Sequence, residues 1–261
     1  VNPPEELAGA VDHLVHVEVV RYPIGIHRPV GRVVQVLGSD AEEAEDLDIV
    51  CCKHDLPRSF SKNVQQEAEA LLAVTLKPAD FKNRLDLRNK PTLSFLPDLG
   101  NPEFSVLKEE DRPARYSIDH ALSLEQTKSG NWKLAIHVAD AAHYVTPDTA
   151  LDREARRRGI AIYLADKFIP ILPPSLSCDR ISLVPGEDRL ALSILIDLGP
   201  TGQILQYEIQ PSVVRVDQQL TYREAQSIFD GDSSEPNALL EDLREVSRAA
   251  RQMREARGAF E

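Results

Sequence analysis

The amino-acid sequence predicts an α+β protein with a mostly antiparallel sheet, and three observations lead to this fold class. Two stretches, around residues 117–138 and 190–216, alternate apolar and polar residues and turn back on themselves through a polar or Gly-Pro turn. Stretches with helical spacing of apolar residues collect mainly after these hairpins, which disfavours a doubly wound parallel sheet. The N-terminal stretch carries β-branched runs separated by proline and glycine, a pattern typical of part of a small β-barrel.

The composition is that of an ordinary globular protein: of 261 residues, 42% are hydrophobic and 28% are charged. The formal net charge of −12 is opposite in sign to the basic face of most nucleic-acid-binding proteins, although a local basic stripe could still bind RNA. The cysteines Cys51, Cys52 and Cys178 lack the spacing of metal ligands, so we expect reduced thiols. No apolar run is long enough to cross a membrane and no signal peptide opens the chain. We therefore predict a cytoplasmic location, with neither a membrane nor DNA as a partner.

The N-terminal part is predicted to hold short strands over Leu14–Val20, Gly31–Leu37 and Leu47–Cys52. A polar helix follows, with Ser61 as its N-cap and a narrow apolar stripe. We place a domain boundary near residue 80, which divides the chain into a small-barrel domain with its linking helix, 1–80, and a larger domain, 81–261.

The central hairpin pairs Ser117–Glu125 with Trp132–Val138, across a polar turn that contains Gly130. Asp119 and His120 stand at the entrance of its first arm. Ionisable groups at the mouth of a buried hairpin are costly unless they are solvated, paired or bound to metal. The local pattern alone favours two solvated loop residues, and a functional site is the alternative.

Three helices follow from capping patterns. Thr149 is predicted to cap a helix over Ala150–Arg158 that ends at Gly159, with arginines in its last turn, where cations complement the helix dipole. Thr221 and Glu224 form the capping box of a second helix, and a long third helix starts at Asn237. The second hairpin, Leu190–Leu198 with Gln203–Val216, lies between the first and second helices.

Several blocks, in matching order and spacing, resemble the catalytic domain of the ribonuclease II/R family of processive, magnesium-dependent 3′→5′ exoribonucleases. The blocks are Asp86–Thr92, Ser117–Ser123, Trp132–Asp140 with His143–Val145, Leu151–Gly159, Tyr163–Leu164, Ile169–Pro173 and Leu176–Ser177. The resemblance implies an RNB-like α+β domain, of which 81–261 is the N-terminal part. It also implies that residues 1–80 include part of an OB or cold-shock type barrel.

The sequence departs from this family at its metal site. Family members carry four aspartates that end in Asp-x-Asp-Asp, and here the last three positions are Ser117, Asp119 and His120. The first aspartate falls on Leu96, or on Asp111 if one counts back from Ser117 without a gap, and Asp98 is a third alternative. The resemblance therefore assigns catalysis to Asp119 and metal binding to Asp119, His120 and Asp111. Mg²⁺ is the implied cofactor, and a set so poor in carboxylates is expected to hold it weakly or not at all.

The resemblance also implies RNA contacts beyond the metal site. Tyr163 corresponds to an aromatic residue that stacks on a base near the RNA 3′ end, and Arg156, Arg157 and Arg158 become candidate phosphate contacts. The structural alternatives are a buried strand tyrosine and a basic last helical turn.

Three functional hypotheses follow. The first is an RNA-binding pseudonuclease, the second an active 3′→5′ exoribonuclease that releases nucleoside 5′-monophosphates from single-stranded RNA, and the third a non-catalytic scaffold that binds a protein. Single-stranded RNA and a protein are thus the two expected kinds of partner. A transition-metal site of His120, His137, Asp140 and His143 is a further alternative, but the spacing of these ligands is unfamiliar and we interpret His137 as a core residue.

Overall fold

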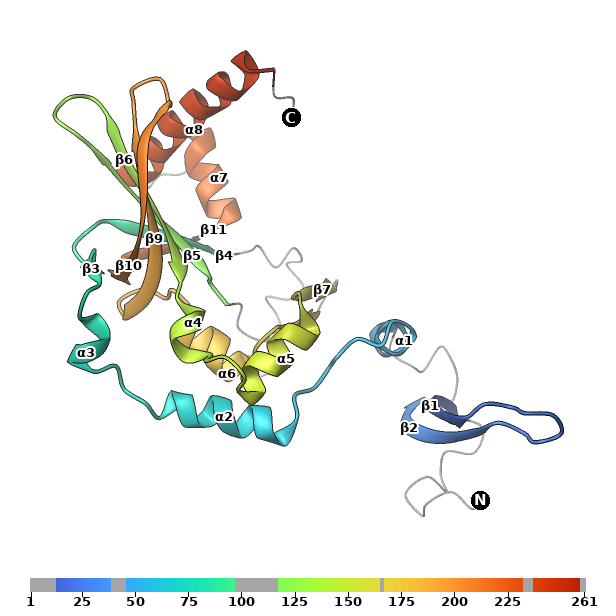
Figure 1. Cartoon of the computed structure of the whole chain (residues 1–261). Coiled ribbons are helices and arrows are strands. Elements are labelled where there is room, and N and C mark those ends of the chain that lie inside the picture. Colours follow the sequence, from blue (N-terminus) through green and yellow to red (C-terminus); the bar gives the residue numbers. More distant parts are fainter. Residues whose placement is uncertain (1–12, 39–45, 97–116, 165–166, 232–236, 259–261) are drawn as a thin grey trace. The chain divides into compact units, whose positions relative to one another are not determined.

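The computed structural model describes residues 13–38, 46–96, 117–164, 167–231 and 237–258 (Figure 1). The chain forms two compact units, one containing the residues up to Phe60 together with Ile162–Ile169, and the other Ser61–Ala161 together with Pro170–Glu261. The domain boundary near residue 80 remains a prediction.

The small unit contains an antiparallel pair, β1 (Leu14–Arg21) and β2 (Val30–Gly38), followed by helix α1 (Asp46–Lys53). The predicted strand at Leu47–Cys52 is therefore wrong. A run this short has no periodicity that separates a strand from a buried helix. As a helix it buries Cys51, and it carries Asp48 as an acceptor for the Gln35 amide at 3.2 Å. The hairpin of β7 (Ile162–Leu164) and β8 (Lys167–Ile169) belongs to the same unit.

The large unit is built on a seven-stranded sheet with the order β11-β4-β5-β6-β9-β10-β3. All pairings from β4 to β10 are antiparallel, and only the outermost strands β3 and β11 pair in parallel. The mostly antiparallel sheet is thus as predicted. The strands are β3 (Leu85–Asp86), β4 (Thr92–Leu96), β5 (His120–Gln126), β6 (Trp132–Ala139), β9 (Asp188–Leu198), β10 (Ile204–Arg215) and β11 (Gln218–Thr221).

Both predicted hairpins form, and they lie side by side because β6 also pairs with β9. β5 and β6 run in register from His120 opposite Val138 to Gln126 opposite Trp132. β10 is longer than its outer neighbour: β3 pairs only with Ser212 and Val213, so the described residues leave the outer edge of β10 from Ile204 to Pro211 without a strand partner.

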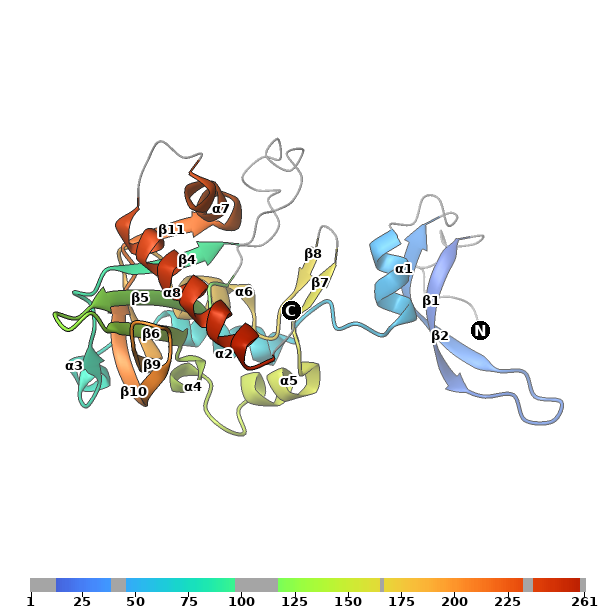
Figure 2. The ribbon, with the colours of Figure 1, turned by 90° about the horizontal axis from the view of Figure 1, so that it is seen from above.

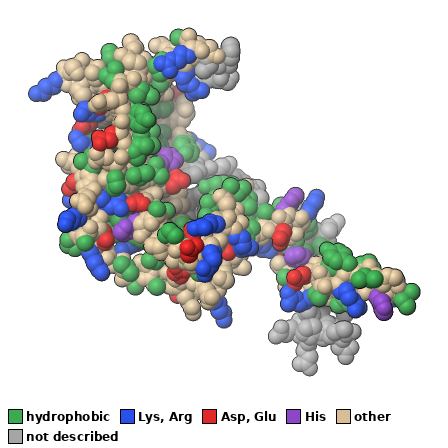
Figure 3. Space-filling model, in the orientation of Figure 1, with side chains coloured by type: hydrophobic (Ala, Val, Ile, Leu, Met, Phe, Trp, Pro, Cys, Tyr) green, Lys and Arg blue, Asp and Glu red, His purple; other side chains and the backbone are tan. Residues whose placement is uncertain are grey.

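One face of the sheet receives helices α7 (Tyr222–Asp230) and α8 (Ala238–Ala256) (Figure 2). Trp132 and Leu198 pack against Val246 of α8. The helices cover this face only in part. Val138 is 39% exposed and Leu192 is 43% exposed, and hydrophobic side chains gather visibly over the upper part of the sheet (Figure 3).

Two helices, α5 and α7, have the caps that the sequence predicts. Thr149 Oγ1 accepts from the Asp152 backbone N–H, and α5 (Ala150–Arg158) ends at Gly159 in a positive-φ conformation. Thr221 and Glu224 form the predicted capping box of α7. The remaining helices are α2 (Lys62–Leu72), α3 (Pro78–Phe81), α4 (Ala141–Tyr144), α6 (Pro174–Leu176) and the π-helical turn η3 (Ser177–Ile181). None of the described helices has the length and apolarity needed to cross a bilayer.

A row of buried polar side chains crosses the other face of the sheet. His137 is fully buried, and its ring joins the Ser123 hydroxyl (Nε2 to Oγ, 3.0 Å) to the Ser193 hydroxyl (Nδ1 to Oγ, 2.7 Å). Ser193 Oγ in turn lies 2.5 Å from Ser212 Oγ. Burial lowers the pKa of His137 to about 4, so the ring is neutral and both nitrogens are engaged. His137 is thus the core residue that the sequence suggested.

Candidate metal and RNA site

The segment that leads into β5 is fixed by its backbone. The Ile118 side chain is buried against Leu183, and the Leu183 N–H donates to the Ile118 carbonyl at 2.8 Å. The Ile118 N–H donates to Ser182 Oγ at 2.9 Å, and the Ser117 hydroxyl donates to the Ser177 carbonyl at 3.0 Å. The Ser117 hydroxyl is therefore hydrogen-bonded to the η3 turn. Ile118 is buried, and Asp119 is the first exposed residue after it.

Asp119 and His120 lie next to each other at the surface. Their side chains are 77% and 47% exposed, and His120 Nδ1 is 2.8 Å from Asp119 Oδ1. Such an exposed pair is worth little to stability. The structure thus brings together two of the three predicted metal ligands, while Asp111, like Asp98, lies outside the described residues.

Asp140, at the end of β6, has a structural role. The Asp119 carbonyl accepts the Ala139 N–H at 2.8 Å, which places the two strand ends side by side. The Asp140 carboxylate accepts from Arg84 Nη2 at 2.6 Å and from the His143 N–H at 3.2 Å. Sequence reasoning missed Arg84, because it lies far from Asp140 in the chain and no motif links them.

These contacts contradict the transition-metal alternative. His137 is held by two serines, Asp140 by Arg84, and His143 Nε2 is 3.9 Å from Asp80. Among the described residues, no group of three or more His, Cys, Asp and Glu side chains is placed to hold a metal ion.

The described residues that the resemblance matches to the family's aspartates do not fit Mg²⁺. Leu96 is half-buried and packs its side chain against the core cluster that contains Ile118. Ser117 offers a neutral oxygen, His120 an imidazole, and Asp119 the one carboxylate among these described residues. Mg²⁺ prefers oxygen ligands whose charge offsets the cost of its dehydration, so this set is a poor one.

The three arginines in the last turn of α5 pair with carboxylates of their own helix. Arg156 pairs with Asp152 at 2.7 Å, and Arg157 pairs with Glu154 at 2.7 Å. The Arg158 side chain is only 1% exposed, contacts Glu154 at 2.8 Å and donates to the Pro170 carbonyl at 3.0 Å. The hydrogen bond from Arg157 is the main reason that the pKa of Glu154 is lowered. Arg158 is thus part of the scaffold, whereas Arg156 and Arg157 extend outwards.

Tyr163 lies on β7, where it pairs with Phe168, and the residue is 66% exposed. It is therefore not the buried strand tyrosine of the structural alternative. An exposed aromatic ring is what stacking on a base requires, and its RNA contact remains a prediction.

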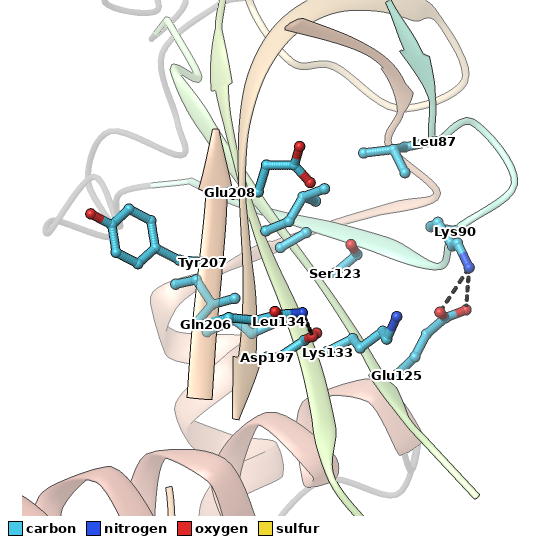
Figure 4. Close-up of a pocket in the computed structure, with 13 residues that line it drawn as sticks. Leu87, Lys90, Ser123, Glu125, Lys133, Leu134, Asp197, Gln206, Tyr207 and Glu208 are labelled. Atoms are coloured by element: carbon cyan, nitrogen blue, oxygen red, sulfur yellow. Dashed lines mark hydrogen bonds and ion pairs between the residues drawn. The ribbon is translucent and has the colours of Figure 1, made fainter. Parts of the chain in front are cut away.

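A groove of about 510 Å³ lies on the sheet face opposite α8 (Figure 4). Its charged residues are Lys90 and Lys133 against Glu125, Asp197 and Glu208, and Lys90 pairs with Glu125 at 2.7 Å. None of the site residues predicted from the sequence lines it. Carboxylates exceed ammonium groups in this groove, so it is poorly suited to a polyanion such as RNA.

Comparisons with known proteins agree with the resemblance. The RNB domain model matches residues 96–261, and the Cold shock domain model matches residues 2–61. The acetazolamide conferring resistance protein zam of Synechocystis is 41% identical over 223 residues, which cover 85% of this chain and 27% of that protein. Ribonuclease R of Thermotoga maritima is 34% identical over 265 residues, which cover 98% of this chain and 35% of that protein. The chain thus spans about a third of the length of these relatives.

Solved structures show the same fold. Mycoplasma genitalium RNase R in complex with double-stranded RNA matches with a TM-score of 0.75 at 18% identity, over 94% of this chain and 41% of that one. Yeast Ssd1, described as a pseudonuclease, matches with a TM-score of 0.70 at 19% identity, over 94% of this chain and 29% of that one. The predicted α+β fold with a cold-shock or OB-like N-terminal part is therefore confirmed. The family model covers more than half of the chain, and the chain belongs to the RNB domain family.

Proposed function

We propose that this chain is part of an RNA-binding pseudonuclease, an RNB-family protein that holds single-stranded RNA without hydrolysing it. One observation carries the proposal. Where the family has Asp-x-Asp-Asp, this chain has Ser117, Asp119 and His120, and the single carboxylate is hydrogen-bonded to the neighbouring imidazole.

The chemistry of phosphodiester hydrolysis explains why this observation supports the proposal. Ribonucleases of this family use Mg²⁺, and metal-assisted hydrolysis needs cations that are held where charge develops on the attacking and leaving oxygens. The Ser117 hydroxyl is neutral and donates a hydrogen bond to the Ser177 carbonyl. The His120 imidazole suits zinc, nickel or manganese better than magnesium. Since the described ligands do not fit Mg²⁺, no hydrolytic step is assigned to this chain.

The RNA-binding half of the proposal draws on different residues. The related RNase R of Mycoplasma genitalium has been solved with ribose-methylated single-stranded RNA and with double-stranded RNA. In this chain Tyr163 exposes its aromatic ring, and Arg156 and Arg157 are 64% and 62% exposed despite their ion pairs. Stacking on an aromatic ring together with guanidinium contacts to phosphate is the usual way of holding a single strand.

An active exoribonuclease is the second candidate, because a relative that is 34% identical is named ribonuclease R. A scaffold for another protein is the third, and RNA affinity distinguishes it from the first two.

The test uses the natural full-length protein and a 3′-labelled single-stranded RNA, with Mg²⁺ or Mn²⁺. We expect saturable RNA binding that weakens with salt, no release of labelled nucleotide, and no change in either result for Asp119→Asn. Nucleotide release that Asp119→Asn abolishes would identify an active enzyme. Absence of RNA binding at low salt would favour the scaffold.

A further inference from the structure

A groove of about 380 Å³ lies between helices α7 and α8, outside the site described above. Its wall on α8 is formed by Arg244, Ser247, Arg248 and Arg251, and its wall on α7 by Gln226, Phe229 and Asp230. The arginines occupy positions i, i+4 and i+7 of one helix, so they share one face and extend over about 10 Å of helix length. Lys and Arg side chains gather over the part of the molecule where Figure 1 places α8 (Figure 3).

Two of these guanidinium groups have no partner among the residues that the structure describes. Within the described part of the chain, neither Arg244 nor Arg248 makes a hydrogen bond or an ion pair. This differs from α5, where Arg156, Arg157 and Arg158 each pair with a carboxylate of their own helix. The acidic residues of α8 do not line the groove.

Asp230 is the one carboxylate among the described residues that line the groove, and it is already hydrogen-bonded within α7. Asp230 accepts two hydrogen bonds from the Gln226 amide, at 2.9 and 3.0 Å. Phe229 adds part of an aromatic surface, since its ring is only partly buried against the core of α7 and α8. The groove therefore combines unpaired guanidinium groups with a hydroxyl and an aromatic edge.

Arg244 and Arg248 lie four residues apart on α8, and like charges at this spacing destabilise a helix by about 0.2–0.5 kcal/mol per pair. Arg244 and Arg248 line the same groove without a carboxylate partner, although the chain as a whole carries a net charge of −12 and is rich in carboxylates. A bound anion would explain both the missing partners and their shared face. Arginine binds phosphate oxygens with paired N–H donors, which makes a phosphate-bearing ligand the best match.

We propose that the α7–α8 groove is a second RNA contact, in which Arg244 and Arg248 bind successive backbone phosphates of a single strand. The inference rests on the proposed RNA binding and adds a surface that neither the family resemblance nor the metal site provides. The groove is a contact to the backbone, which carries no base sequence, so it raises affinity for all sequences alike.

The test measures RNA affinity of the full-length protein at several salt concentrations, for the unmodified protein and for Arg244→Ala with Arg248→Ala. For single strands, each lost phosphate contact reduces the slope of log K against log salt by about 0.7, so the double variant should lose about 1.4. Arg254→Ala with Arg257→Ala is the matched control, because it removes two charges from the end of the same helix outside the groove. The control should keep the original slope.

The outcomes are separable. If the unmodified protein binds RNA and the groove variant keeps its slope, or if the control loses as much, the groove contact is refuted while RNA binding stands. If the unmodified protein binds no RNA, both proposals fail together. Thermal unfolding gives an independent check: the groove variant should be no less stable than the unmodified protein, because no partner is lost and alanine favours the helix.

Discussion

His120 Nδ1 lies 2.8 Å from Asp119 Oδ1, so the carboxylate at the entrance of β5 is hydrogen-bonded to the imidazole of the next residue. A carboxylate–imidazole pair at the surface is a ligand set for a softer cation than Mg²⁺.

Restoring the missing charges tests this conclusion. In the full-length protein, Ser117→Asp combined with His120→Asp should raise the affinity for Mg²⁺, because positions 117, 119 and 120 then all carry carboxylates. Calorimetric titration measures this affinity. RNA cleavage should return only if Asp98 or Asp111 supplies a further ligand. Adding Asp119→Asn to the double variant is the control, and it should remove the gained affinity. If Mg²⁺ affinity stays the same in the double variant, the carboxylate count is not what limits the site.

Replacing Tyr163 with alanine should weaken binding to single-stranded RNA. Stacking of a base on one aromatic ring is worth about 1–3 kcal/mol, and the ring is exposed on β7. Fluorescence anisotropy with a labelled oligonucleotide measures the loss. Tyr163→Phe keeps the ring and should retain most of the affinity. Equal binding by Tyr163→Ala and the unmodified protein would remove Tyr163 from the RNA surface.

The buried His137 predicts a pH dependence of stability. Its pKa is about 4 in the folded chain against an ordinary 6.5, so below pH 6.5 the unfolded chain takes up a proton that the folded chain refuses. The free energy of unfolding of the large unit should therefore fall as the pH drops from 6.5 to 4, by up to about 3 kcal/mol. Urea unfolding at several pH values measures this. His137→Gln should flatten the profile in that window, and an unchanged profile would mean that other groups set the pH dependence.

The contact between Arg84 and Asp140 should be important for folding. Their side chains are 12% and 18% exposed, and replacing Asp140 with Asn leaves a largely buried guanidinium without its counter-charge. Loss of one partner of such a pair typically costs on the order of 3 kcal/mol. Chemical denaturation of Asp140→Asn, Arg84→Met and the double variant forms a double-mutant cycle. If the three losses are additive, the two residues are not coupled and the pair does not stabilise the fold.

Local patterns in the sequence predicted most of the fold. Thr149 with Gly159, and Thr221 with Glu224, carry cap chemistry that acts within one or two helical turns, so the helices they bound were predictable. The strand predicted at Leu47–Cys52 failed because a short apolar run acquires its conformation from what it packs against. The sequence predicted that His137 is a core residue, but it did not predict the row of hydrogen-bonded side chains around it. Ser193 bonds to His137 from a different strand, and the sequence alone does not show which residues of two strands lie opposite each other.

The candidate site was less predictable. The sequence identified Asp119 and His120 as neighbours, but the engagement of Asp140 by Arg84 depends on residues 56 positions apart. The arginines on α5 and α8 look alike in the sequence. Asp152 and Glu154 stand one turn before the α5 arginines and pair with them. Glu241 and Glu245 stand three residues before Arg244 and Arg248, but in the described part of the chain they neither pair with these arginines nor line the groove. Side-chain pairing of this kind follows from the folded helix surface and not from composition.

The long strand β10 has a practical consequence for anyone who prepares this chain. From Ile204 to Pro211 it exposes a row of backbone donors and acceptors, and it also carries the exposed side chains of Leu205, Tyr207 and Ile209. Such an edge is a template on which further strands can assemble, so concentrated samples of residues 1–261 should tend to self-associate and precipitate. A lysine in place of Ile209 would interrupt the apolar row with a charge and should keep the preparation dispersed.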